Sequence, residues 1–577
     1  MKIAVLLILA LLTACSDNNF TRDGKLTEHQ SLNIKNYIKA QRLDNKKIDI
    51  KGEYGQDLRG LKLIGVDLSG VDISDVDLRG AEIIRVNFTG ANLQGVIVAN
   101  AVIQESDFTN VSFNNLNAQN VDFQASIFQN AIFQNANLSG ANMNEVDLSN
   151  SKIYNSKLHK VDLSNAKLNN VEMKNVDLQE STFVKATFQN SKISNVAFFG
   201  VDLRAVSLVE SVFTDCSFES SDLSDSNNTK GHFSKVDFSQ SIIDRAKFDS
   251  TQFDDANFTN ASMKKINLEN VVIHQGIFKD VVMIYSQLSN VNIQESKMDG
   301  LTLTNSNINR LYMNKIQADD NKLNKVAITD MKITNSTFTN SRFSNADGNK
   351  IKATNVDFTD TYFDNYNLKN AIFDSCNLSK VMFRNDKIYQ TEFRMSKMDQ
   401  IAVINCNVQS LTFNNSPIQN SQFSSVTSQE LIVINSPANN NVLLNNKGLE
   451  KINSSNAITS LALLSNVELS HLNLSHLDLS KLSIQNATLQ GTIFKWTNFK
   501  DSAFKNCTFQ DVDLSYADLT NANLSGSKIF NSNLFNTTFD NTNLSSTELN
   551  GLDFTRSIIN NINLDQSNLV NVLGIQH

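Results

Sequence analysis

The residues with the greatest capacity for chemistry in this chain of 577 residues are seven histidines and five cysteines. The histidines are scattered along the sequence, at His29, His159, His232, His274, His471, His476 and His577. They form no HExxH pattern and no comparable spacing of metal ligands. The sequence therefore predicts no metal site, and it contains no motif that predicts a cofactor.

The carboxylates and hydroxyl nucleophiles also lack a catalytic arrangement. Asp and Glu occur along the whole chain, whereas acid–base catalysis requires paired carboxylates in a cleft that shifts their pKa values. The sequence has no nucleophile elbow and no glycine-rich phosphate loop. We therefore expect a protein without catalytic residues, which is not an enzyme.

Cys15 differs from the other cysteines because of the residues before it. Lys2 supplies a positive start, and residues 3 to 12 form an apolar run that is too short to span a bilayer. The run ends in Leu12-Thr13-Ala14-Cys15. Small residues before the cysteine suit the groove of a peptidase, and the cysteine supplies a sulfur that can form a thioether.

This segment resembles the lipobox of bacterial lipoproteins. The resemblance implies a signal peptide at residues 1–14, cleavage between Ala14 and Cys15, and lipid attached to Cys15, so that the membrane is one partner. Two or more acyl chains anchor a protein stably, at roughly 0.8 kcal/mol per buried CH₂. Ser16 resembles the residues that permit sorting to the outer membrane, which implies an envelope location facing the periplasm or the cell surface. The alternative is an ordinary secretory signal with an incidental cysteine.

The composition fits a folded protein with an unusual core. Apolar residues make up 41% of the chain and charged residues 19%. Only two prolines occur, and 36 Phe far outnumber nine Tyr and one Trp. The formal net charge of -8 combines 51 basic with 59 acidic residues, which argues against a surface that binds nucleic acid.

A five-residue repeat fills most of the sequence. A large apolar residue recurs at every fifth position from 58 to 463 and, after one residue inserted near Asn466, from 469 to 569. A small or β-branched residue lies two positions earlier, as in Val66-Asp67-Leu68-Ser69-Gly70. Of 103 central positions, 98 are apolar; the exceptions are Asn228, Gly348, Ser428, Gly448 and Asn453.

A period of five matches neither the helix nor the strand, so each unit must end in a corner that changes the direction of the chain. The central residue and the small residue two positions earlier point to the same side of an extended segment. The intervening Asn, Asp, Ser and Gly suit tight turns, because they form local hydrogen bonds and tolerate unusual φ angles.

Segments such as Ala136-Asn137-Leu138-Ser139-Gly140 and Ala522-Asn523-Leu524-Ser525-Gly526 match the motif A(D/N)LXX. From residue 56 to about 570 the chain resembles the pentapeptide-repeat family. The resemblance implies an all-β solenoid, a right-handed quadrilateral β-helix with four pentapeptides in each 20-residue coil. The repeats would make about 26 coils, stacked roughly 4.8 Å apart.

In this fold, residues 20 positions apart lie on the same face of neighbouring coils. Two internal Phe ladders are then expected, one of Phe198, Phe218, Phe238, Phe258 and Phe278 and one of Phe213, Phe233 and Phe253. The small inner position holds four cysteines, which predicts core packing and no redox or metal role: Cys216, Cys376, Cys406 and Cys507.

The regions outside the regular repeat suggest a domain organisation. Residues 15–26 form a tether, and residues 27–55 form a cap with a helix over 27–46, where Thr27 and Gln30 resemble a capping box. Repeats fill 56–465 and, after the phase shift, 466–570. The stretch 425–456 is irregular: a loop or kink, a binding feature, or simple decay of the repeat.

Three smaller irregularities carry further expectations. Asn228 and Gly348 at central positions suggest small bulges. Residues 571–577 carry apolar side chains that either cap the last coil or form the interface of a homodimer.

The sequence supports three hypotheses for function. The first is a non-enzymatic, lipid-anchored envelope rod that binds unidentified proteins or other envelope components. The second is a surface-exposed or secreted virulence or adhesion factor. The third follows from the family resemblance alone: a mimic of B-form DNA that inhibits or protects a topoisomerase. DNA mimicry requires a strongly acidic surface and a cytoplasmic location, and both the balanced charge and the signal segment disfavour it.

Overall fold

The computed structural model describes residues 24–424 and 478–575, with short segments between them at 427–428, 431–434, 438–439, 443–445, 464–465, 470 and 473–476. The predicted signal peptide, Cys15, most of the tether and most of the irregular stretch 425–456 lie outside the described residues. The chain divides into two compact units, Met1–Ile277 and Phe278–His577. Each unit is a β-solenoid, and together they make about 23 turns, against about 26 predicted from the repeats.

The strands of the first unit are short and follow the faces of the coil. One face carries β1 (Lys62–Ile64), β2 (Glu82–Ile84) and β3 (Val102–Gln104). A second face carries β4 (Ser112–Asn114), β5 (Ile132–Gln134), β6 (Lys152–Tyr154), β7 (Glu172–Asp177), β8 (Lys192–Ala197), β9 (Val212–Thr214), β10 (His232–Ser234), β12 (Gln252–Asp254) and β14 (Val272–His274). A third carries β11 (Lys247–Asp249) and β13 (Asn267–Glu269).

The second unit repeats this layout with longer strands. One face carries β15 (Val282–Ile284), β17 (Thr302–Thr304), β20 (Lys322–Asn324), β22 (Arg342–Ser344), β24 (Tyr362–Asp364), β27 (Met382–Arg384), β31 (Ala402–Ile404), β35 (Gln422–Ser424) and β39 (Leu443–Asn445). Four strands are long enough to pass a corner: β16 (Gln287–Gln294), β18 (Asn307–Asn314), β21 (Ala327–Thr339) and β23 (Asp347–Asp357). Later coils carry β43 (Thr508–Gln510), β44 (Lys528–Phe530), β46 (Glu548–Asn550) and β48 (Asn568–Val570).

The register of the strands confirms the 20-residue coil. Every printed pairing is parallel, and Lys152 of β6 lies beside Glu172 of β7, one coil later. The turns between faces are formed by the fifth residue of each repeat, which adopts a positive φ throughout, for example 55° at Asn175. Asn and Gly are frequent there because both tolerate this left-handed conformation.

The polar residue before each central position stabilises the next turn. The Asp67 carboxylate, for example, accepts a hydrogen bond from the Ser69 N–H at 3.0 Å. This contact recurs along both units and explains why Asp and Asn precede the central residue in the motif, since their side chains satisfy a backbone donor two residues later.

The central residues fill the interior of the coils. In the first unit Phe198, Phe218, Phe238 and Phe258 stack one above another, with ring centroids 4.5, 5.1 and 5.2 Å apart. The second predicted ladder, of Phe213, Phe233 and Phe253, is also formed, with centroid separations of 5.2 Å. The expected Phe278 belongs to the second unit.

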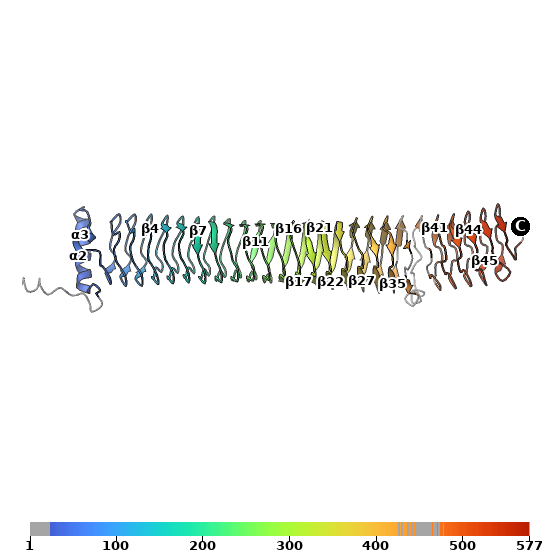
Figure 1. Ribbon diagram of the computed structural model, residues 1–577, viewed down its shortest axis with the longest axis horizontal. Helices are drawn as coiled ribbons and strands as arrows, with labels where there is room; N and C mark the ends of the chain where they lie inside the picture. Colours follow the sequence, from blue (N-terminus) through green and yellow to red (C-terminus); the bar gives the residue numbers. More distant parts are fainter. Residues whose placement is uncertain are drawn as a thin grey trace, which may run out of the picture. The chain divides into compact units, whose positions relative to one another are not determined.

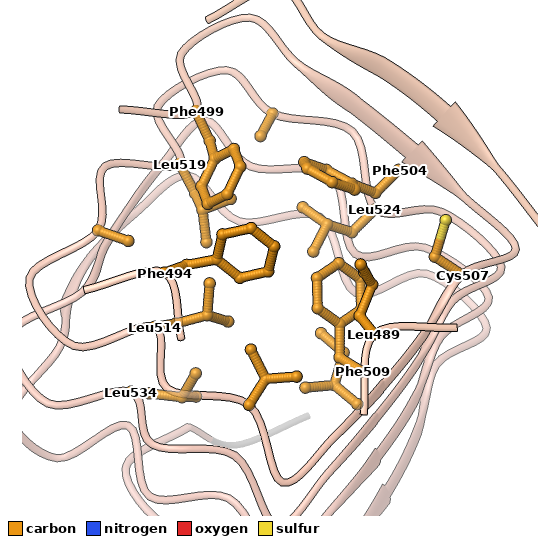
Figure 2. Close-up of a cluster of buried hydrophobic side chains, with 14 of the residues drawn as sticks. Leu489, Phe494, Phe499, Phe504, Cys507, Phe509, Leu514, Leu519, Leu524 and Leu534 are labelled. Atoms are coloured by element: carbon orange, nitrogen blue, oxygen red, sulfur yellow. The ribbon is translucent and has the colours of Figure 1, made fainter. Parts of the chain in front are cut away.

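Four aromatic rings close the interior of one coil in the second unit. Phe494, Phe499, Phe504 and Phe509 come from four successive repeats and point toward one another from the sides of the coil (Figure 2). Neighbouring rings in this set meet edge to face, with centroids 5.0 to 5.5 Å apart. Such contacts stabilise a core beyond the burial of area alone.

The small inner position often holds a serine that is fully satisfied. Ser191 accepts the Val171 N–H at 3.1 Å and donates to the Leu168 carbonyl at 2.7 Å. A hydroxyl therefore replaces a methyl group without an unpaired polar atom, because it both accepts and donates.

A helical cap covers the first coil of the first unit, as predicted. Helix α2 (Glu28–Leu43) begins with the Thr27–Gln30 capping box, and a second short helix not foreseen from the sequence, α3 (Ile50–Tyr54), follows it. Both lie beside the first coils (Figure 1). Ile34 and Ile38 are buried, whereas Leu32 and Leu43 are 52% and 84% exposed, so only part of the predicted apolar set faces the coil.

The expected bulges at Asn228 and Gly348 are wrong. Asn228 donates its backbone N–H to the Lys247 carbonyl at 2.8 Å, like its regular counterparts. Gly348 lies in β23 in register with Ile328 and Leu368. The space that its missing side chain leaves is filled by Tyr366, which is 1% exposed; a Cβ on Gly348 would lie 2.1 Å from Tyr366 Oη.

The inserted residue lies earlier than its predicted position near Asn466. Gln422 of β35 pairs with Leu443 of β39, an offset of 21 residues instead of 20. Ile434 pairs with Ser465, 31 residues later, and Leu464 pairs with Ile484 at the regular offset of 20. The phase therefore changes before Leu443, and the repeat is regular again from Leu464.

Candidate functional site

The four described cysteines are core residues, as predicted. All are buried and unpaired. Cys216 Sγ lies 3.3 Å from the Thr214 carbonyl. Burial raises the pKa of the thiols to about 11 in Cys216, Cys376 and Cys507 and to about 12 in Cys406. Thiols of this kind are poor nucleophiles, because the reactive form is the thiolate.

The described histidines and carboxylates form surface contacts. His232 lies 2.7 Å from Asp254 with both side chains partly exposed, and no group of three or more potential ligands in the described ranges is arranged to hold a metal ion. Arg245 donates to both carboxylate oxygens of Asp225, one coil earlier, at 2.7 Å. These bonds lower the pKa of the Asp225 carboxyl. Exposed pairs of this type contribute little to stability.

The residues predicted to attach lipid, Ala14 and Cys15, lie outside the described residues, and so does His471. Where the structure does describe the chain, it contains no helix with the length and apolar character needed to cross a bilayer.

An outward-facing aromatic column is the most distinctive feature of the described surface. His476, Trp496 and Tyr516 occupy the same corner of three successive coils in the second unit, with φ angles of 61°, 63° and 61°. Trp496 is the only tryptophan of the chain and is 50% exposed. Bulky residues rarely adopt this conformation, which costs a non-glycine residue roughly 1–2 kcal/mol.

The rings of this column stack on one another. The centroids of Trp496 and Tyr516 are 4.0 Å apart and nearly parallel, and the His476 ring lies 6.4 Å from Trp496. Phe535 meets Tyr516 edge to face at 5.5 Å. Because the ring faces are turned toward each other, the column presents mainly ring edges to its surroundings.

Two cations accompany the column. The ammonium group of Lys495 lies 5.8 Å from the centroid of the Tyr516 ring, and the guanidinium group of Arg556 lies 5.4 Å from that of Phe535. We call Trp496, Tyr516, Phe535, Lys495 and Arg556 the aromatic corner. Trp, Tyr and Arg are the residue types that most often dominate protein–protein interfaces.

Sequence reasoning missed the aromatic corner. The signal was present, since Trp496 and Tyr516 are 20 residues apart at positions that elsewhere hold mostly Asn, Gly, Asp or Lys. It was overlooked because the apolar periodicity directs attention to the central residues, whereas these rings lie on the outside.

Comparison with known proteins supports the solenoid as a repeat architecture. The family model described as "Pentapeptide repeats (8 copies)" matches residues 57–90, 87–124, 232–270, 354–385, 494–526 and 532–570, and "Pentapeptide repeat region" matches 126–203. Together they span about half of the chain. No curated protein matches it significantly.

Several solved structures are similar to parts of the chain. HetL, a pentapeptide repeat protein from the cyanobacterium Nostoc sp. strain PCC 7120, is 18% identical over 43% of this chain and 86% of its own, with a TM-score of 0.24. QnrB1, a plasmid-mediated fluoroquinolone resistance protein, is 19% identical over 30% of this chain and 80% of its own, with a TM-score of 0.17. With the five-residue repeats, the 20-residue register and the family matches in agreement, the chain belongs to the pentapeptide-repeat family.

Proposed function

We propose that this protein is a non-enzymatic, lipid-anchored component of the bacterial envelope that binds a protein partner through the aromatic corner. The observation that carries the binding role is the placement of the only tryptophan on the outside of a solenoid whose other large apolar residues point inward. The location rests on the sequence Leu12-Thr13-Ala14-Cys15.

The chemistry of the aromatic corner suits a protein groove lined by apolar and acidic groups. Ring edges carry the positive part of the aromatic quadrupole, and Lys495 and Arg556 add two positive charges. The solenoid holds these side chains on a hydrogen-bonded scaffold, so that little conformational entropy is lost when a partner binds. A sugar ring would need an open ring face, and the stacking of Trp496 on Tyr516 covers those faces.

Two alternatives remain as hypotheses. A surface-exposed or secreted adhesion or virulence factor would use the same corner outside the cell. DNA mimicry is disfavoured by the mixed charge of the outer faces, where Lys230 pairs with Glu210 and Lys315 with Glu295 one coil apart, at 2.9 and 2.8 Å. A continuous acidic surface would be needed to resemble the phosphate backbone.

The first test concerns the anchor. Wild type and Cys15→Ala are compared in the native host by metabolic labelling with a fatty acid, fractionation and protease shaving of intact cells. We expect the wild type to be labelled and to sediment with the outer membrane, and the variant to lose both properties. Shaving separates the periplasmic from the surface location. An unlabelled wild type in the cytoplasm would contradict the proposal.

The second test concerns the aromatic corner. The photo-crosslinking residue p-benzoylphenylalanine replaces Trp496 or, as a matched control, Asn486, which has a φ of 56° at another corner two repeats earlier. We expect a protein adduct only from position 496, and we expect Lys495→Glu with Arg556→Glu to abolish it. Identical adducts from both positions, or adducts that survive the charge reversal, would refute the assigned surface.

We also propose a homodimer formed by the last described coil. Its inner residues Ile559, Ile562, Leu564 and Leu569 are only partly buried, because no further coil covers them in the structure. Leu573 and Ile558 beside them are 60% and 55% exposed. A second copy would cover these apolar side chains.

A further inference from the structure

Asp386 is the exceptional carboxyl group of the second unit. It occupies the small inner position, where other coils hold Ala, Val, Ser or Cys, and it is 1% exposed. On the same face, Tyr366 lies one coil before it and Cys406 one coil after it, both buried. A carboxylate buried in this way loses its hydration without an ion-pair partner.

One oxygen of Asp386 reproduces the contact made by neutral residues at this position. Its Oδ1 accepts the Tyr366 N–H at 2.7 Å. In an earlier coil the amide oxygen of Asn321 accepts the Leu301 N–H at 2.8 Å, and the Ser191 hydroxyl accepts the Val171 N–H at 3.1 Å. A neutral side chain therefore satisfies the inner site.

The other oxygen, Oδ2, has no hydrogen-bond partner. Residues at the inner position direct their donors to two carbonyl groups, 23 and 2 residues earlier. In the next coil, Cys406 Sγ lies 3.5 Å from the Phe383 carbonyl and 3.4 Å from that of Ile404. The same offsets from Asp386 lead to Phe363 and Arg384. A protonated Oδ2 can donate to such a carbonyl, whereas a carboxylate can only be repelled by it.

No cation around Asp386 is free to compensate a negative charge there. The Arg384 guanidinium donates to Asp364 at 2.7 Å, and Arg342 donates to the same carboxylate at 3.0 Å. The neighbouring Lys387 is exposed on the outside. Tyr366 and Cys406 are neutral acids whose own pKa values are raised by burial.

We propose that Asp386 folds as a neutral carboxylic acid that takes the place of the usual serine, and that its ionisation makes the coils around it a pH-sensitive joint in the second unit. Below neutral pH the protonated carboxyl completes the hydrogen bonds of the inner site. At higher pH the buried carboxylate faces carbonyl oxygens, and the coils that contain Tyr366, Asp386 and Cys406 open more often. This inference does not depend on the lipid anchor or on the aromatic corner.

The direction of the pH effect follows from the two states of the group. Burial raises the pKa of Asp386 to about 7 in the folded protein, although the Tyr366 N–H favours the charged form. In an opened segment the pKa returns to its ordinary value near 4. Because the open form releases its proton first, stability is highest at low pH, falls as the pH rises from about 4 to about 7, and is then level.

Hydrogen exchange of the full-length protein tests the joint. For peptides covering 360–410, the opening equilibrium, corrected for the intrinsic pH dependence of exchange, should rise on the order of a hundredfold between pH 5 and 8.5 relative to Asp386→Asn. Asp386→Ser should behave like Asp386→Asn, since serine is the ordinary occupant. An opening equilibrium with the same pH dependence in wild type and both variants would overturn the proposal.

Two further measurements exclude a general charge effect. Asp364→Asn removes a nearby carboxyl whose pKa is lowered by Arg384, so it should leave the rise between pH 5 and 8.5 in place. Infrared spectroscopy at pH 5 should show the carbonyl band of a protonated carboxylic acid, lost at pH 8.5 and missing in Asp386→Asn. Absence of this band from the wild type at pH 5 would refute the neutral acid directly.

Discussion

At the level of single residues, Gly348 and Tyr366 show how a repeat exchanges volume between its two inner positions. The central position normally carries the large side chain and the inner position the small one. Here Gly348 is central and Tyr366 is inner, and the tyrosine ring lies edge to face with Phe343 and Phe363, at centroid distances of 6.1 and 5.5 Å. The core stays filled because one irregularity compensates the other.

This exchange predicts strong coupling between the two positions. Gly348→Leu should destabilise the second unit by about 1–3 kcal/mol through overpacking, and Tyr366→Ala by about 3–5 kcal/mol through a cavity. The double variant restores the ordinary pattern and should be more stable than the sum of the two changes by about 1–3 kcal/mol. Guanidinium denaturation of all four proteins measures this term, and strictly additive changes would contradict the packing described.

The hydroxyl group of Tyr366 also carries a consequence. Its Oη is buried without a hydrogen-bond partner. Tyr366→Phe should therefore leave stability unchanged or increase it, which the same denaturation measurement would show.

At the level of the elements, the corners determine where each strand ends. Asn175 at one corner donates from its side-chain amide to Asn155 at 2.8 Å and accepts from Asn195 at 2.7 Å, so that the amides form a ladder along the first unit. The ladder links three coils on the outside, while the Phe ladders link them on the inside.

The corner predicts a graded response to substitution. Asn175→Ala should destabilise the local coils by about 1–2 kcal/mol, because alanine tolerates a left-handed φ less well than asparagine and cannot form the ladder. The chain does accept alanine at Ala205, with φ 58°, so the variant should still fold. Asn175→Gly keeps the conformational freedom and should cost less. Hydrogen exchange of the Asn155 and Asn195 coils would reveal the order, and an equal loss in both variants would argue against the conformational cost.

At the level of the whole molecule, the proposed homodimer predicts a mass that depends on the last described coil. Light scattering after size-exclusion chromatography should give two chains for the mature protein without its lipid. Leu573→Asp with Ile558→Asp should give one, because buried carboxylates would face the partner. Ile242→Asp, at a residue 44% exposed on the first unit, serves as the control and should remain dimeric. A monomeric wild type would refute the dimer.

The sequence alone determined the architecture, the 20-residue register and the inner positions of the cysteines. The physical reason is repetition: about a hundred copies of one pattern admit only one arrangement that buries every central residue, so the predictions for Phe198 and Cys216 needed no further information. The lipid attachment at Cys15 remains a prediction from local sequence.

Only the tertiary structure decided how deviations from the pattern are accommodated. Gly348 suggested a bulge because its sequence neighbours are regular, yet Tyr366, 18 residues away, fills the space across the coil. The same distance in sequence hid the aromatic corner, where Trp496 and Tyr516 become neighbours only when the coils stack. The exposed state of Leu32 and Leu43 likewise depends on the angle at which α2 lies on the first coil. A period of five specifies which residues point inward, but it does not specify which side chains, one coil apart, share volume, charge or a hydrogen bond.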